Sequence, residues 1–175
     1  MKLGGRHIPL SCCLAALAIY SPPVDAAAIT IPAGLNPGGQ YRLVFVTSTT
    51  RSATSTDIAS YDATVAAAAA SSPELNALGT NWRVIGSTAA VNAFDHIGGA
   101  FSMPLYNLGG LRVADNSTDL WDTSISNPIQ FDEFGALTTA SFVWTGTQEN
   151  GSPRTETGIY GHARPSDFRA NIADR

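Results

Sequence analysis

The pattern of apolar and polar residues predicts one buried strand and one long helix in the first half of the chain. The run 41–47 is β-branched, aromatic and almost continuously apolar, which is typical of a central strand. Residues 57–71 place apolar side chains on one face at helical spacing, and the alanine run 66–70 favours a helix. Thr56 or Asp57 can cap this helix, because a side-chain oxygen there accepts an otherwise unpaired N–H of the first turn.

Shorter elements follow, separated by glycine and proline. The segments 82–86 and 141–146 have strand character, and 104–114 predicts a hairpin with a Gly-Gly turn. Residues 115–135 form a long polar loop that carries acids and aromatics. The predicted fold class is α+β, with one main helix packed on a small antiparallel sheet and a long loop-rich half. Because long loops in compact domains are usually functional or disordered, we expect residues 95–135 to form the working face.

The N-terminal residues have the three parts of a secretory signal peptide. Two basic residues precede the apolar run 8–20, and small residues occupy the −3 and −1 positions of a cut after Ala26. The apolar run is short for a membrane span, which takes about 20 residues. A buried N-terminal helix and a lipid anchor on Cys12 or Cys13 are alternative interpretations. We expect removal of residues 1–26, which leaves a cysteine-free chain with no membrane span that is secreted or held in the cell envelope.

The composition argues against some classes of partner. Of the 175 residues, 14% are charged, the net charge is −4, and no basic stretch occurs. A protein that follows a phosphate backbone needs clustered Lys and Arg, so we expect no nucleic-acid partner. The Gly-Gly pairs have no strand-to-helix phosphate cradle around them, which argues against a nucleotide-binding loop.

Acidic and amide side chains cluster in the 115–135 loop. Calcium takes about six to eight oxygen ligands, so the acids of this loop are weak calcium candidates: Asp115, Asp119, Asp122, Asp132 and Glu133. Their spacing matches no EF-hand loop, and a solvated acidic loop is the more ordinary interpretation. An aromatic face beside carboxylates and amides also suits a sugar, which gives the candidate ligand-binding set Asp115, Asn116, Asp119, Trp121 and Asp122. Trp121 has a second interpretation, as a packing residue that holds the loop.

No arrangement of catalytic residues emerges from the sequence. Ser87 and His96 can be combined on paper with Asp95 or Asp115, but no serine lies in a Gly-x-Ser-x-Gly turn. Neither histidine of the expected exported chain has the spacing of paired metal ligands. We therefore assign no catalytic residue. The alternative is a secreted glycan hydrolase whose acid and base come from Asp115, Asp119, Asp132 or Glu133.

Several short motifs, taken in their order, resemble a known family. They are the runs 41–48, 82–88, 104–115, 119–122, 128–129 and 143–147. Together they resemble a secreted bacterial domain of unknown function that is related to the C-type-lectin-like, endostatin-like fold, over about residues 36–150. The chain is also similar to proteins with a C-terminal PEP-CTERM sorting signal, which an exosortase processes at the cell envelope. The resemblance implies that the terminal strands of the domain pair with each other.

The resemblance and the residues together give an expected organisation and function. We expect a signal peptide at 1–26, a C-type-lectin-like domain at 27–150 and an irregular segment at 151–175. The family's closing strand and sorting tail are not visible after residue 150, so we interpret the last segment as truncated or frameshifted. The expected function is that of an exported, non-enzymatic binding or structural protein of the bacterial envelope or extracellular matrix, which contacts polysaccharide or a matrix protein. An inactive truncated family member is a further alternative.

Overall fold

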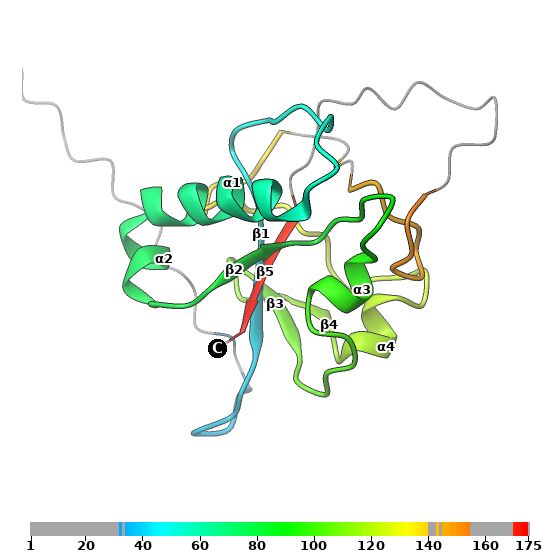
Figure 1. Ribbon diagram of the computed structural model, residues 1–175. Helices are drawn as coiled ribbons and strands as arrows, with labels where there is room; N and C mark the ends of the chain where they lie inside the picture. The colour runs from blue at the N-terminus through cyan, green and yellow to red at the C-terminus, as the bar shows by residue number, and fades with distance from the viewer. Residues whose placement is uncertain (1–31, 33, 140–142, 144, 155–169, 175) are drawn as a thin grey trace, which may run out of the picture.

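The computed structural model describes residues 32, 34–139, 143, 145–154 and 170–174 (Figure 1). The expected signal peptide and most of the expected strand at 141–146 lie outside these residues. The described elements, in chain order, are β1 (Arg42–Val46), α1 (Ile58–Ser71), α2 (Pro73–Ala77), β2 (Trp82–Val84), α3 (Ala93–His96), β3 (Leu105–Asn107), β4 (Arg112–Ala114), α4 (Ser117–Leu120) and β5 (Ala170–Asp174).

The long helix, the central strand and the hairpin form where the sequence predicts them. α1 begins after Asp57, whose Oδ1 accepts a hydrogen bond from Ala59 N at 3.0 Å, as expected for a cap. All five residues of β1 are buried. The Gly-Gly turn joins β3 and β4, and Gly110 has a φ of 78°, which favours glycine because a side chain is strained there.

The described strands form one mixed sheet of five strands in the order β2-β5-β1-β3-β4. β1 pairs with β5 in antiparallel orientation but with β3 in parallel orientation. The prediction of an α+β fold is confirmed, and the prediction of an antiparallel sheet is wrong at the β1–β3 pair. The physical reason is the long connection, which carries α1, α2, β2 and α3 and is long enough for a crossover between parallel strands.

The C-terminal segment contains a strand that the sequence analysis did not predict. β5 lies between β1 and β2 and pairs antiparallel with both, with Val44 opposite Ile172 and Arg83 opposite the same residue. The prediction that 151–175 is irregular is therefore wrong for Ala170–Asp174. The backbone of β1 supplies the pairing partners that this short segment lacks on its own. Residues 155–169 lie outside the described part of the chain.

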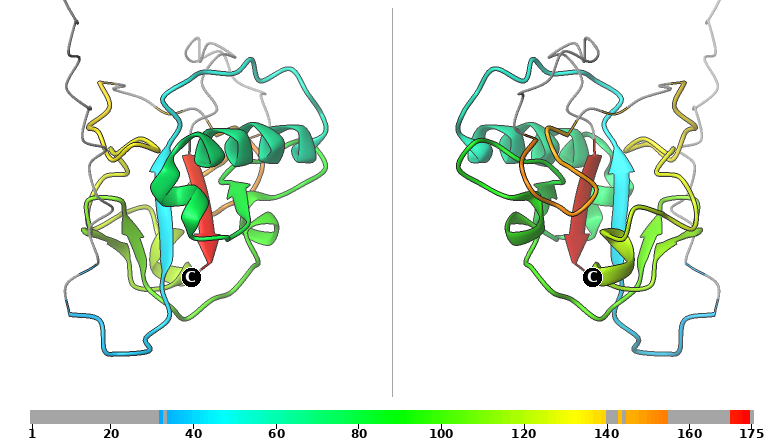
Figure 2. Two further views of the ribbon diagram at one scale, coloured as in Figure 1. Left: turned by 90° about the vertical axis from the view of Figure 1, so that its left-hand side faces the viewer. Right: turned by 90° about the vertical axis from the view of Figure 1, so that its right-hand side faces the viewer.

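Alternate residues of β1 point to opposite faces of the sheet and build two separate cores. On the helix side, Leu43 and Phe45 pack with Tyr61 of α1. On the loop side, Val44 packs with residues of the loop-rich half, namely Ile85, Ile97, Phe101, Leu105, Val113, Ala114 and Leu120. The two side views show α1 crossing one face of the sheet and α4 lying on the other (Figure 2). The sheet thus separates the regular half of the molecule from the loop-rich half.

Candidate functional site

Much of the predicted working face, residues 95–135, lies on the loop side of the sheet, and we call it the loop face. The helix-side core instead takes up Tyr106, Leu108 and Phe131 of this range. Phe101, Leu105 and Leu120 anchor it in the loop-side core. Two hydrogen bonds tie its segments together: Ser117 N donates to Phe101 O at 3.0 Å, and Phe101 N donates to Ser117 Oγ at 3.1 Å. The polar residues of this face therefore rest on a packed base.

Three of the candidate ligand-binding residues meet at the first turn of α4. Asn116 Oδ1 accepts a hydrogen bond from Asp119 N at 3.1 Å, and Asp119 Oδ2 accepts one from Asp115 N at 2.7 Å. Arg112 Nη1 donates to Asp115 Oδ1 at 2.8 Å. The pKa of Arg112 is raised, first by the hydrogen bond from its side chain to Tyr106 and then by the bond to Asp115. The structure brings Asp115, Asn116 and Asp119 together, and their side chains build the turn.

Asp122 and Asp132 each close a turn of their own. Asp122 Oδ1 accepts a hydrogen bond from Ser124 N at 3.1 Å. Asp132 Oδ1 accepts two, from Phe134 N at 3.0 Å and from Ala136 N at 2.9 Å. An aspartate that accepts from backbone N–H groups two residues further on is a common way to stabilise a turn.

Glu133 is buried and connects the loop face to the end of the central strand. Only 3% of its surface is exposed. Its Oε2 accepts a hydrogen bond from Ser48 N at 2.7 Å, and its Oε1 accepts one from Ser48 Oγ at 2.5 Å. A buried carboxylate is costly unless it is hydrogen-bonded, and these two bonds meet that requirement. Glu133 therefore fixes the loop to β1.

The hydrogen-bond partners of the loop acids bear on their interpretation as calcium ligands or as hydrolase residues. Among the residues that the structure describes, no three His, Cys, Asp or Glu side chains gather where they could hold a metal ion. Each of the five candidate acids accepts a hydrogen bond from backbone N–H, from Ser48 Oγ or from Arg112. Calcium binding by these acids stays a prediction.

Trp121 lies at the end of α4, half-buried against the loop-side core. Its Nε1 is buried and finds no hydrogen-bond acceptor among the described residues. A buried donor without a partner costs roughly 1–3 kcal/mol, which packing of the large ring must offset. This arrangement favours the packing interpretation of Trp121. Its role as a ligand contact stays a prediction.

Beside α4 the loop face is hollowed, and we call this place the loop-face hollow. It has a volume of about 440 Å³ and opens to solvent. Its lining carries no charged residue and consists of Ala100, Phe101, Ser102, Asn116, Ser117 and Thr118. No described residue accepts a hydrogen bond from Asn116 Nδ2, and the exposed hydroxyl groups of Ser102 and Thr118 have no partner in the described part of the chain. Of the candidate ligand-binding residues, Asn116 alone lines this hollow.

His96 has a partner that sequence reasoning missed. Its Nε2 lies 2.9 Å from Oδ1 of Asp62 in α1, and the same oxygen accepts a hydrogen bond from Val84 N at 2.9 Å. Ser87 Oγ instead accepts from Ala93 N at 2.9 Å and from Thr147 Oγ1 at 3.0 Å. In the described structure His96 thus pairs with Asp62 and not with Ser87. No local signal could have found this pair, because 34 positions separate its members.

Comparison with known proteins assigns no family or function to this chain. The chain matches no known protein family, no curated protein and no solved structure. Within the described residues, no helix has both the length and the apolar character needed to cross a membrane.

Proposed function

We propose that the protein is an exported, non-catalytic binding protein of the bacterial envelope or extracellular matrix, and that its loop face contacts a neutral polysaccharide. The signal peptide expected from the sequence and the resemblance to exosortase-sorted proteins support the location. The observation that carries the proposal is the loop-face hollow, which is uncharged and presents the amide N–H groups of Asn116 and the hydroxyl groups of Ser102 and Thr118, none of which bonds to another described residue.

The chemistry of the hollow matches a sugar without charged groups. Sugar hydroxyl groups both donate and accept hydrogen bonds, and Ser102, Asn116 and Thr118 supply hydroxyl and amide groups that do the same. Ala100 and Phe101 add apolar surface that suits the C–H faces of a sugar ring. The nearby carboxylates hold the turns together, so the hollow itself favours a neutral ligand over a cationic one.

The alternative of a glycan hydrolase has less support. A glycosidase needs two carboxyl groups on opposite sides of the scissile bond, roughly 5–10 Å apart and available to exchange protons with the substrate. The four acids named for this role are engaged by backbone groups, by Ser48 or by Arg112. A binding function can use the same face while these acids keep their hydrogen bonds.

The C-type-lectin-like fold is part of this proposal. Two features support it: one main helix packs on the sheet, and the last described strand, β5, pairs with the first, β1. The second is what the resemblance implies for the terminal strands of the domain.

Affinity electrophoresis tests the proposal. The purified protein is run through gels that contain dextran, laminarin, galactomannan or xyloglucan, and we expect at least one polysaccharide to retard it. Ala100 is exposed at the hollow, so Ala100→Arg places a long side chain over it and abolishes the retardation. Ala89→Arg is the matched control, because Ala89 is also exposed but does not line the hollow. Equal retardation of the two variants, or none for the parent protein in any gel, contradicts the proposal.

A further inference from the structure

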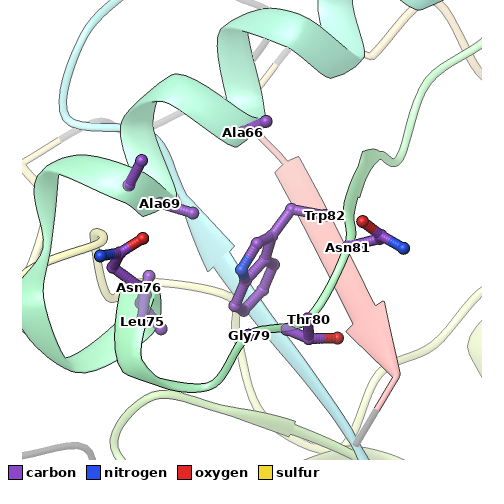
Figure 3. Close-up of a pocket in the computed structure, with 9 residues that line it drawn as sticks. Ala66, Ala69, Leu75, Asn76, Gly79, Thr80, Asn81 and Trp82 are labelled. Carbon is purple, nitrogen blue, oxygen red and sulfur yellow. The ribbon is translucent and has the colours of Figure 1, made fainter.

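A second hollow lies on the helix side, between the second half of α1, α2 and the start of β2 (Figure 3). Its volume is about 170 Å³, below the roughly 300–1,000 Å³ of drug-sized small-molecule sites, so it has room for one small group only. It exists because α1 presents only Ala66, Ala69 and Ala70 to it, and their methyl groups leave space beside Leu75 and Trp82. We call it the Trp82 hollow.

The wall of the Trp82 hollow is held firmly in place. Figure 3 shows the indole of Trp82 between the alanines of α1 and the Gly79-Thr80 turn. Trp82 is 6% exposed, and its ring packs edge-to-face on Phe45, with 4.9 Å between the ring centroids and 78° between the ring planes. The indole therefore offers a fixed apolar edge to whatever enters the hollow.

The rim of the Trp82 hollow is polar but uncharged. None of the nine residues that line it is Asp, Glu, Lys, Arg or His. Asn76 and Asn81 are exposed, and within the described part of the chain their side-chain amides make no hydrogen bond. Each amide supplies one acceptor and two donor hydrogens, a combination that fits neighbouring hydroxyl groups of a sugar. Figure 3 shows the Asn76 amide beside the alanines, whereas the Asn81 side chain points away from the indole. Apolar methyl groups and an indole edge beside the neutral Asn76 amide again match a sugar without charge.

We propose that the Trp82 hollow is a second carbohydrate-binding site, which takes one neutral sugar residue. This inference rests on the proposed function of the loop face and extends it. The loop-face hollow borders Phe101 of the loop-side core, whereas this hollow borders Trp82 of the helix-side core, so the two lie on opposite faces of the sheet. One chain then holds two glycan strands at once and cross-links a polysaccharide network.

Calorimetric titration of the whole protein tests the second site through the number of sugars bound. The probes are maltohexaose, laminarihexaose, cellohexaose and mannohexaose. We expect at least one of them to bind at two sites per chain. Ala70→Arg covers the Trp82 hollow and halves the number bound. Ala67→Arg is the matched control, since Ala67 is exposed on the same helix but does not line the hollow, and it leaves the number unchanged.

The same titration separates failure of this site from failure of the loop face. If Ala70→Arg changes nothing while Ala100→Arg removes all binding, the second site is overturned and the proposed function stands. If Ala70→Arg removes binding and Ala100→Arg does not, the Trp82 hollow is supported and the loop-face proposal is contradicted. No binding of any probe overturns both. Thermal melts by circular dichroism identify any variant that fails to fold, and Asn76→Ala, which removes the amide without adding bulk, then replaces Ala70→Arg.

Discussion

Both sides of the sheet bury apolar residues, but they use their polar residues differently. On the helix side, a single long helix covers the core, and the carboxylate of that helix, Asp62, bonds to Val84 N and His96 instead of closing a turn. On the loop side, short elements cover the core, and carboxylates close the turns between them. The difference teaches that an acidic loop can be a structural device, and that the places left for a ligand are the uncharged gaps between its turns.

The largest effect on the free energy of unfolding is expected from removing a buried leucine on each side of the sheet. The two substitutions test whether the two sides are equally well packed. Leu43 is 1% exposed on the helix side and Leu105 is 0% exposed on the loop side. Replacing either with alanine removes buried methyl groups and leaves a cavity, which lowers the free energy of unfolding by about 2–5 kcal/mol. Urea unfolding followed by circular dichroism measures both variants. A loss for Leu105→Ala far below that for Leu43→Ala would show that the loop side is loosely packed.

A smaller effect tests the structural use of the loop acids. Glu133→Ala removes both hydrogen bonds to Ser48 and leaves Ser48 N without its partner, so we expect a loss of roughly 1–3 kcal/mol in unfolding free energy. Glu133→Gln keeps one acceptor oxygen and should lose less. Glu149→Gln, at an exposed position, is the control and should stay within about 0.5 kcal/mol of the parent protein. Equal stability of Glu133→Ala and the control would mean that Glu133 is free for another role.

Local patterns predicted the elements whose signals are local. The spacing of Ile58, Tyr61 and Val65 and the cap at Asp57 were enough for α1, and the Gly-Gly pair was enough for the β3–β4 hairpin. Pairing between distant segments carried no such signal. The parallel β1–β3 pair depends on a long crossover, and β5 depends on the neighbouring strands to hold a segment whose own pattern is weak.

The sequence analysis predicted which residue types lie at the candidate site, but it did not predict their hydrogen-bond partners. Asp115, Asn116 and Asp119 do lie close together, but at the start of the short helix α4 and not in a continuous loop. Their hydrogen bonds to backbone N–H groups follow from a local geometry that composition does not encode. The sequence analysis did not predict the Asp62–His96 pair, because the two residues are distant in sequence. It did not predict the two hollows either, since they are defined by the space that small side chains leave.

The most direct test of the account is to repeat the affinity electrophoresis with and without calcium. The account holds that an uncharged hollow binds the polysaccharide while the acids only build turns. It predicts equal retardation in chelator and in excess calcium, and an unchanged melting temperature, because a ligand that bound the folded state would raise it. Retardation that appears only with calcium, together with a higher melting temperature, would contradict the account and return the loop acids to the role of metal ligands.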